Sequence, residues 1–257
     1  MTDPTSLTLT EAARAVRDGA LRAEALADAC LDRIGRLNPT LNAFLSVEPE
    51  EALAAARAAD AEARAGRLRG PLHGVPLAHK DMFYRAGKRC TCGSPTIRGD
   101  FRPERTATVL ERLDAAGAVT LGTLHMAEFA MGPTGHNAHL GRCRNPWDPD
   151  RITGGSSSGS GAAVAGRLAF GSLGSDTGGA GRLPAALGGG VGPEPRQGAT
   201  PRGGGRAPAG RLGCVGPRAR RAGEAAALVS GVTGRADAAG APCPGGGGAR
   251  GVVPISR

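Results

Sequence analysis

The sequence predicts an α/β fold in which helices flank a central sheet, and three observations support this. Short apolar strands alternate with amphipathic helical patterns downstream of residue 70, which is typical of α/β proteins. The first 66 residues carry mainly the 3.6-residue apolar period of surface helices. The chain has 257 residues, which is enough to bury a sizeable core.

The N-terminal region begins with two predicted helices. Thr8 or Thr10 can cap the first, which ends near Gly19. The second covers residues 21–37 and is stopped by Asn38-Pro39, because the residue before a proline disfavours helical geometry.

The remaining elements continue the alternation. The patterns predict, in order, a strand at 41–47, an Ala-rich helix at 49–66, a strand at 75–78, a helix at 106–117 and a strand at 118–122. The strand at 75–78 leads into Lys80, and site residues in α/β folds tend to follow strand ends. Residues 131–150 read as an irregular stretch in which Trp147 is a packing anchor.

Lysine is rare in this chain, and its positions are informative. The sequence contains 30 Arg but only Lys80 and Lys88. Arginine does not lose its proton in proteins, whereas a desolvated lysine can. A lysine retained at position 80, in an apolar setting, is therefore a candidate base.

Positive charge is concentrated at the C-terminal end. Residues 188–257 hold ten Arg and three acidic residues, so they supply +7 of the net charge of +9. One interpretation is an Arg/Gly-rich arm that binds nucleic acid, but such arms gain from base-stacking aromatics and this segment has none. The other interpretation is a degenerate continuation of the preceding domain, rich in Gly, Ala, Pro and Arg.

The cysteines and histidines do not form a recognisable metal motif. The six cysteines match no zinc spacing and read as reduced cytosolic thiols: Cys30, Cys90, Cys92, Cys143, Cys214 and Cys243. His125, His136 and His139 lie close in sequence, but no acidic partner has helical ligand spacing, so we predict no metal. No apolar run of about 18 residues is present, so no membrane span is expected.

The central stretch from Thr153 to Pro184 contains two glycine-rich turns. Residues 155–159 fit a G-x-S-x-G nucleophile elbow with Ser157 at its centre, yet the preceding residues 144–150 are broken by prolines where an elbow needs a strand. A flexible Gly/Ser linker is the alternative, although an apolar helix at 162–165 follows at once. The residues alone leave both alternatives open.

Three separated segments together resemble a known family. In chain order they are HGVPLAHKD (73–81), RNPWDPDRITGGSSSGSGAAVA (144–165) and GSLGSDTGGAGRLPAA (171–186). This combination is similar to the amidase signature family, which includes general amidases and the A-type subunits of the glutamyl-tRNA(Gln)/aspartyl-tRNA(Asn) amidotransferase. The resemblance runs from about Leu7 to Leu187 and implies a mixed central sheet flanked by helices, incomplete at the C-terminus.

The resemblance implies a Lys–cis-Ser–Ser catalytic triad. Lys80 matches the family's neutral lysine base. Ser156 matches the serine on a cis peptide that relays a proton between the lysine and the nucleophile. The nucleophile should be the serine of a G-G-S-I-R run, and here that position is Ala180. A methyl group cannot attack a carbonyl, so this chain is expected to be impaired or inactive.

The second glycine turn matches the family's oxyanion hole. The resemblance implies that the backbone N–H groups of Thr177, Gly178 and Gly179 stabilise the oxyanion. Asp176 and Arg182 match further family positions, as residues behind the turn that fix its shape.

The implied function is hydrolysis of a carboxamide C–N bond to a carboxylate and ammonia or an amine, without a metal or an organic cofactor. The alternative is a non-catalytic scaffold or partner-binding fragment, or a pseudogene product, of an amidotransferase A-type subunit. The expected partners are a small-molecule amide, and among proteins other amidotransferase subunits or a second copy of the chain. No nucleic acid or membrane is expected to bind directly, and the expected compartment is the cytoplasm.

The resemblance also suggests three regions. Residues 1–68 form an N-terminal helical layer, residues 69–187 form the amidase signature core, and residues 188–257 form a degenerate, partly disordered continuation. Within the last region, 215–217 matches a V-G-P run and 225–228 continues as a helix. Arg218 replaces a position that is mostly uncharged in the family and is unsuited to a core.

Overall fold

A five-stranded mixed sheet forms the centre of the computed structural model, which describes residues 3–195, 199–201, 203–205 and 214–233. The strands are β1 (Phe44–Val47), β2 (Pro76–Lys80), β3 (Val119–Leu124), β4 (Gly171–Asp176) and β5 (Cys214–Arg218). Their order across the sheet is β1-β3-β2-β4-β5. The predicted α/β class is confirmed.

The strand directions position the polar ends of β2 and β4 together. β2 pairs in parallel with both β3 and β4, whereas β1 and β5 run antiparallel at the two edges. The carboxyl ends of parallel strands meet at one edge of a sheet, where sites commonly form. Lys80 ends β2 and Asp176 ends β4, so the topology brings these two residues to the same region.

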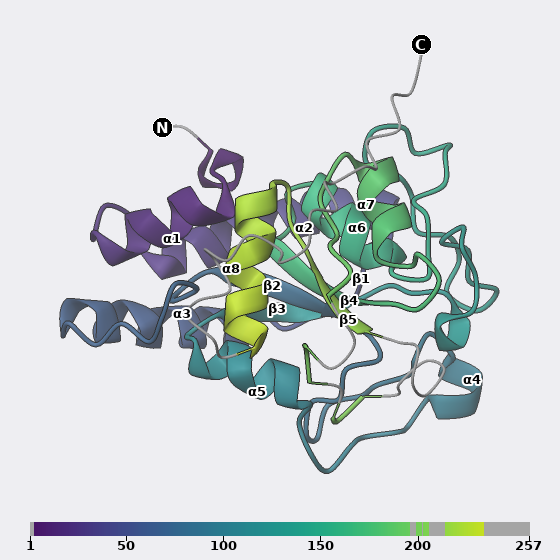
Figure 1. Cartoon of the computed structure of the whole chain (residues 1–257), viewed down its shortest axis with the longest axis horizontal. Helices are drawn as coiled ribbons and strands as arrows, with labels where there is room; N and C mark the ends of the chain where they lie inside the picture. The colour runs from purple at the N-terminus through teal and green to yellow at the C-terminus, as the bar shows by residue number, and fades with distance from the viewer. Residues whose placement is uncertain (1–2, 196–198, 202, 206–213, 234–257) are drawn as a thin grey trace.

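Helices cover both faces of this sheet (Figure 1). They are α1 (Leu9–Arg17), α2 (Ala23–Leu41), α3 (Pro49–Arg64), α4 (Pro95–Arg98), α5 (Thr108–Ala115), α6 (Ser158–Ala165), α7 (Arg182–Gly188) and α8 (Ala222–Thr233), with 3-10 turns η1 (Pro4–Ser6) and η2 (Glu128–Ala130). Successive residues of β4 face opposite layers: Gly171 lies against Leu228 of α8, and Ser172 donates a hydrogen bond to Ser160 of α6. None of the helices in the described ranges is long and apolar enough to cross a membrane.

Side-chain oxygens satisfy the free backbone N–H groups at the first turns of α1 and α2. Thr8 accepts a hydrogen bond from the backbone N–H of Glu11, and Glu11 accepts one from the N–H of Thr8, which makes a capping box for α1. The residue before α2 provides no side-chain cap for its first turn. Instead, Asp60 of α3 accepts from the backbone N–H groups of Ala23 and Glu24.

The predicted end of the second helix was wrong. α2 passes through Pro39 and ends at Leu41, and the following strand begins at Phe44 rather than at residue 41. The helix stops because Asn42 adopts the left-handed conformation and the Asn38 side chain accepts from the backbone N–H groups of residues 43 and 44.

The sequence suggested that Trp147 is a packing anchor for its loop, but its side chain does not enter a core. Its side chain is 74% exposed, and its indole N–H donates to the carbonyl of Gly188. The residue therefore connects the irregular stretch to the end of α7 by a hydrogen bond at the surface.

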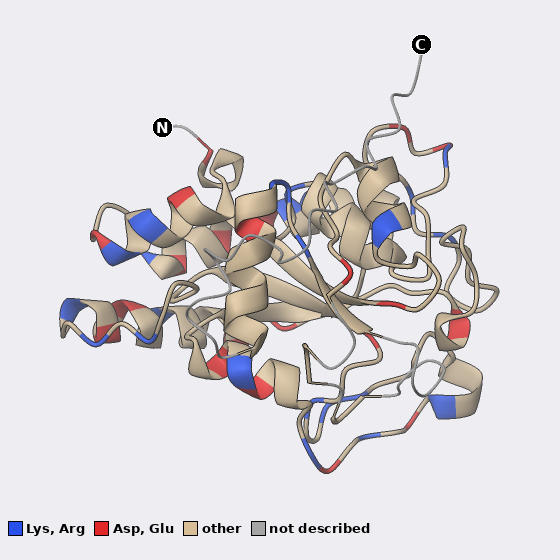
Figure 2. Ribbon diagram, in the orientation of Figure 1, with Lys and Arg blue, Asp and Glu red and all other residues tan. Residues whose placement is uncertain are grey.

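The region after residue 187 contributes an edge strand and a covering helix, β5 and α8. Arg218, expected to be unsuited to a core, is fully buried in β5 because three backbone carbonyls accept from its guanidinium. The expectation for Cys243 falls outside the described residues. Figure 2 shows that charged residues otherwise lie mainly on helices and connecting segments, with the strands mostly uncharged.

Candidate active site

Lys80 is the centre of a cluster of hydroxyl groups. It is fully buried at the end of β2, and its Nζ lies 2.8 Å from Ser156 Oγ, 3.0 Å from Ser157 Oγ and 2.8 Å from Ser175 Oγ. The two elements that supply these serines are the loop before α6 and the strand β4. The structure therefore brings Lys80 and Ser156 together across 76 residues of sequence.

The loop before α6 is fixed in an uncommon backbone geometry. The Gly155–Ser156 peptide is cis, and Gly154 has φ of 78°, a left-handed conformation that glycine adopts without strain. The next residue, Ser157, donates from Oγ to the carbonyl of Ser175 and accepts from the N–H of that residue. This pair of bonds ties the loop to β4 and holds all three hydroxyls around Nζ.

The environment of Lys80 favours its neutral form. Burial is the main cause that lowers the pKa of Lys80 well below its usual range, and the nearby charge of Arg218 lowers it further. No carboxylate of the described residues lies within ion-pair distance of Nζ.

The hydrogen-bond geometry is compatible with a neutral amine. A neutral amine has two N–H donors and one lone pair. The hydroxyl of Ser157 is committed to a carbonyl, so its oxygen must accept from Nζ. With a protonated amine, Nζ donates to the hydroxyls of both Ser156 and Ser175. With a neutral amine, the same distances let one of these two hydroxyls donate to the lone pair of Nζ, which is the arrangement that a base requires.

The turn between β4 and α7 is organised by Asp176. Its two carboxylate oxygens accept from the backbone N–H of Gly179 (2.6 Å), Gly181 (2.8 Å) and Arg182 (3.1 Å), and from the Arg182 guanidinium. Burial alone would raise the pKa of Asp176, but the hydrogen bonds from Arg182, Gly179 and Gly181 outweigh it and lower the pKa. Asp176 therefore remains ionised and fixes the turn.

The backbone N–H groups of this turn differ in whether they are free to donate a hydrogen bond to an oxyanion. The N–H of Gly179 is directed to Asp176, so it reaches an oxyanion only by sharing that bond. The N–H groups of Thr177 and Gly178 donate to no acceptor in the described part of the chain. Gly179 has φ of 109°, which side-chain-bearing residues rarely adopt.

A cavity of about 210 Å³ lies above this turn. Its polar wall consists of Ser156, Ser175 and residues 177–180, and its apolar wall includes Pro133 and Leu183. Lys80, Asp176 and Arg182 lie behind the wall rather than in it. The predicted nucleophile position, the relay serine and the oxyanion turn thus share one cavity, and Lys80 reaches it through the serines.

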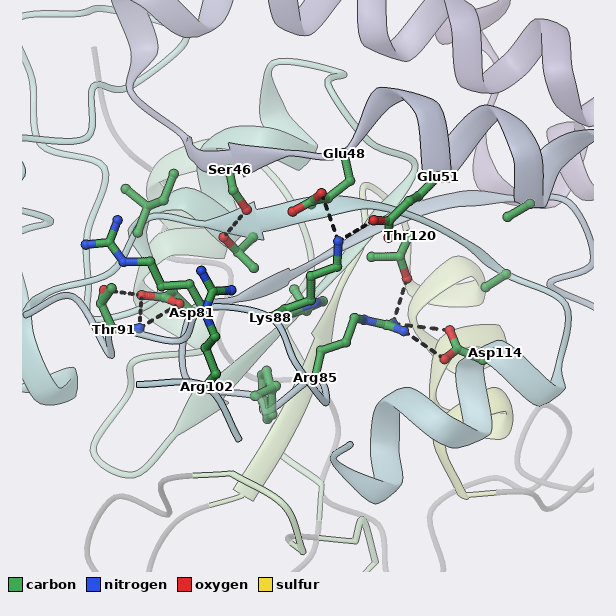
Figure 3. Close-up of a pocket in the computed structure, with 18 of the residues that line it drawn as sticks. Ser46, Glu48, Glu51, Asp81, Arg85, Lys88, Thr91, Arg102, Asp114 and Thr120 are labelled. Carbon is green, nitrogen blue, oxygen red and sulfur yellow. Dashed lines mark hydrogen bonds and ion pairs between the residues drawn. The ribbon is translucent and has the colours of Figure 1, made fainter. Parts of the chain in front are cut away.

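A second cavity, of about 640 Å³, lies elsewhere (Figure 3). It is lined by His79, by residues of α3 and by the segment after β2. Lys80, which follows His79 in the chain, contacts the α6 side of the sheet instead. Its charges are largely paired with each other: Lys88 bridges to Glu48 and Glu51, and Arg85 binds Asp114 and Thr120. It contains none of the serines around Lys80, so we place the candidate chemistry in the smaller cavity.

His125 and His139 contact other protein groups, and the cysteines of the described residues are buried. Within the described ranges no group of three or more His, Cys, Asp or Glu side chains could hold a metal ion. His125 lies 3.0 Å from Ser158 Oγ and 3.1 Å from the carbonyl of Gly141, and His139 pairs with Glu128. Five cysteines lie in the described ranges, and all are buried thiols outside any disulfide: Cys30, Cys90, Cys92, Cys143 and Cys214.

Sequence reasoning did not foresee three contributors to this site. Ser157 was considered as a nucleophile rather than as a hydrogen-bond partner of the lysine. From the sequence alone, Ser175 has no assigned role, and Arg218 is unsuited to a core. The sequence signal for Ser175 is only its place directly before Asp176, because the strand that ends there and pairs in parallel with β2 is seen only in the structure.

A family model described as Amidase matches residues 25–244 of this chain. Among curated proteins, the chain is 50% identical over 196 residues to the glutamyl-tRNA(Gln) amidotransferase A subunit of Pseudomonas aeruginosa, covering 76% of this chain and 40% of that protein. The corresponding protein of Chloroflexus aurantiacus is 49% identical over 202 residues, covering 79% of this chain and 41% of that protein. The chain therefore spans about two fifths of the length of these relatives.

Solved structures give the same result for the fold. A peptide amidase from Stenotrophomonas maltophilia superposes with a TM-score of 0.83 and 37% identity, covering 93% of this chain and 51% of that one. The glutamyl-tRNA(Gln) amidotransferase A subunit of Thermotoga maritima superposes with a TM-score of 0.75 and 32% identity, covering 93% of this chain and 49% of that one.

Proposed function

The chain belongs to the amidase family, and from this premise we propose that it binds the carboxamide group of a small molecule in the cavity above the β4–α7 turn. The contact that carries the proposal is the 2.8 Å hydrogen bond between buried Lys80 and Ser156, beside the cis peptide at Gly155–Ser156. It pairs a lysine in an environment that favours the neutral form with a hydroxyl that opens into the cavity.

The proposed proton path runs from position 180 to Lys80. In the family's reaction the nucleophile at position 180 gives its proton to Ser156, and Ser156 gives its own to the neutral amine of Lys80. The N–H groups of Thr177 and Gly178 are the available donors for the oxyanion, with Gly179 sharing its bond to Asp176. These roles are all assigned to protein groups, so the proposal includes no metal or organic cofactor.

Ala180 interrupts this path at its first step. Its methyl group offers no lone pair and no proton, so Ser156 has nothing to deprotonate. Removing the nucleophile of a serine hydrolase lowers turnover by about 10⁶-fold. We therefore infer that the chain retains the amide-binding arrangement but is impaired or inactive as a hydrolase.

The finer assignments are part of the same proposal. The substrate class is a small carboxamide, and we place the protein in the cytoplasm. A non-catalytic role, as a scaffold or partner-binding fragment related to an amidotransferase A-type subunit, is the second candidate, and the alanine at position 180 favours it specifically. The other subunits of such an amidotransferase, or a second copy of this chain, are the partners proposed for that role.

An activity assay tests the proposed inactivity. Purified chain is incubated with short aliphatic and aryl amides, and release of ammonia or aryl amine is measured beside Lys80→Met and a mock preparation. We expect no turnover above the mock preparation. Turnover that Lys80→Met abolishes and that the mock preparation lacks would refute the proposed inactivity and establish the chain as an amidase.

A further inference from the structure

Arg218 is a buried cation directly behind the candidate site. Its guanidinium donates to three carbonyls: Nη1 to Gly216 at 2.7 Å, and Nη2 to Ala180 at 2.9 Å and to Ser175 at 3.3 Å. The side chain is fully buried, and its Nε has no hydrogen-bond partner among the described residues. These bonds link the end of β4 and the turn that carries position 180 to the edge strand β5.

The positive charge of Arg218 has little local compensation. Within the ranges that the structure describes, no carboxylate lies within ion-pair distance of its guanidinium, and the nearby Asp176 is paired with Arg182. Burial lowers the pKa of Arg218 to about 10, so the side chain is still charged at neutral pH. A buried charge that is satisfied only by neutral carbonyls is costly. Because charges interact more strongly in the interior than in water, this charge also acts strongly on nearby ionisable groups.

The guanidinium also occupies space that small residues leave open. A Cβ atom at Gly181 would lie 2.9 Å from Nη2 of Arg218 and 2.6 Å from the Asp176 carboxylate. A Cβ atom at Gly174 would lie 2.5 Å from Nη1. Arg218 is therefore packed between β4 and the turn, and it fits because positions 174 and 181 have no side chain.

Lys80 and Arg218 converge on the same residue. The amine of Lys80 contacts the hydroxyl of Ser175, and Arg218 donates to the carbonyl of Ser175. The other ionisable groups that act on Lys80 are Asp176 on β4 and Cys92 in the segment after β2, and both favour its charged form. Arg218 is the neighbour that opposes them.

We propose that Arg218 is a positioning residue of the Lys80 site: its guanidinium ties the turn at position 180 to the end of β4, at the same Ser175 whose hydroxyl contacts Lys80, and it places a buried positive charge behind that amine. This inference rests on the proposed function, in which the neutral amine of Lys80 is the base. It gives a buried arginine in β5 a definite task, and it acts through Lys80 without contacting the substrate.

The rarity of lysine makes the test direct. Protein labelled with ¹³C- and ¹⁵N-lysine gives side-chain signals from Lys80 and Lys88 only. The ¹³Cε shift of each lysine is followed by NMR against pH in the parent chain, in Arg218→Gln and in Arg218→Met. Gln removes the charge but keeps an amide donor for the carbonyls, whereas Met removes both. Lys88, which pairs with Glu48 and Glu51, is the internal control.

We expect Lys80 to be neutral at pH 7 in the parent chain. Both substitutions should raise the pKa of Lys80 by about one unit or more, which is a tenfold fall in its neutral-to-charged ratio at a given pH. Hydrogen exchange of the hydrogen-bonded amides of Gly179, Gly181, Arg182 and Leu183 should accelerate at least tenfold in Arg218→Met and less in Arg218→Gln.

The failures of the two proposals are distinguishable. A charged Lys80 at pH 7 in the parent chain would contradict the base assigned under the proposed function. A neutral Lys80 whose titration is the same in all three proteins would overturn only the role of the Arg218 charge. Unchanged exchange of these four amides in Arg218→Met would overturn its positioning role.

Discussion

Position 180 determines what the site can do chemically. The surrounding groups are in place: Ser156, Ser175 and the N–H groups of Thr177 and Gly178 line one cavity, and Lys80 lies behind them. The missing group is one oxygen atom. At the scale of single residues, the proposed amide-binding site therefore differs by this one atom from a site that could react with an amide.

Ala180→Ser is predicted to restore only part of the activity. The new hydroxyl supplies a nucleophile, but the N–H of Gly179 stays committed to Asp176, and loss of one oxyanion donor costs about 10²–10³-fold in turnover. Amide hydrolysis should appear, should vanish in the double variant with Lys80→Met, and should stay about 10²-fold or more below a full-length amidase assayed beside it. Equal rates would show that the turn is already competent.

Buried histidines predict a loss of stability on acidification. Burial lowers the pKa of His79 to about 3 and that of His125 to about 4, both below the ordinary value near 6.5. The unfolded chain therefore binds protons first as the pH falls below 6.5, and stability decreases from there towards the folded pKa values. Between pH 7 and pH 5 each histidine should cost about 2 kcal/mol.

The variant His79→Asn isolates one of these contributions. Denaturant unfolding at pH 7 and pH 5 should show about half of the histidine-dependent stability loss in His79→Asn, because His125 still titrates. The exposed His136 provides the control variant, His136→Asn. A loss in His79→Asn as large as in the parent would mean that the His79 ring is charged in the folded protein.

At the scale of elements, the β4–α7 turn and β5 pack against each other. Gly181 leaves room for the guanidinium of Arg218, and Asp176 fixes the turn from the other side. Gly181→Ile should therefore destabilise the protein by about 1–3 kcal/mol through overpacking. Arg218→Met should cost less in that background than alone, because the new side chain fills the vacated volume.

A double-mutant cycle measures this coupling. The unfolding free energies of the parent, the two single variants and the double variant should give an interaction energy of about 1 kcal/mol or more. The pair Gly178→Ala and Arg218→Met is the control, since no described atom lies within 4 Å of a Cβ at Gly178. Additive free energies in the Gly181 cycle would contradict the inferred packing.

The helices α2 and α3 depend on one carboxylate. Asp60 of α3 accepts from the N–H groups of Ala23 and Glu24, which α2 leaves unsatisfied at its first turn. Asp60→Ala should lower the unfolding free energy by about 1–2 kcal/mol, the usual cost of a lost cap, and Asp60→Asn by less. Equal unfolding midpoints for the parent and Asp60→Ala would show that other groups satisfy this turn.

The helices and strands that have a clear apolar pattern of their own were predicted correctly. The prediction failed where contacts with other segments determine whether a strand forms or where a helix ends. The α3 helix and the strands at β2 and β3 followed directly from their apolar patterns. The end of α2 did not, because the Asn38 side chain and the left-handed Asn42 terminate the helix beyond Pro39. The strand β4 was not identified either, since GSLGSD has small residues that form a strand only between β2 and β5.

At the scale of the whole molecule, the topology explains why such distant residues meet. Two parallel strands end side by side, and one supplies Lys80 while the other supplies Ser175 and Asp176. The chain spans about two fifths of the length of the curated relatives it matches. The activity of those relatives is therefore a proposal for this chain, even though the fold and the family are established.

The site could be predicted from the sequence only in part. The rarity of lysine pointed to Lys80, and the resemblance supplied Ser156, Ala180 and the turn at 177–179. The hydrogen bonds of Ser157 and Ser175 to Lys80, and the burial of Arg218, depend on how the strands align, which no single segment encodes. From the sequence alone, Arg218 is a charged side chain unsuited to a core, and only the structure shows the three carbonyls that accept from it.

Labelling with a sulfonyl fluoride tests the central claim most directly, because the reagent forms an oxygen–sulfur bond with an activated serine and releases fluoride. Intact mass is measured for the parent chain, Ala180→Ser, and Ala180→Ser with Lys80→Met. We predict one adduct, mapped to position 180, on Ala180→Ser alone. An adduct on the parent chain that depends on Lys80, or an unlabelled Ala180→Ser protein that is folded, would contradict the claim that this site retains its base and lacks a nucleophile at position 180.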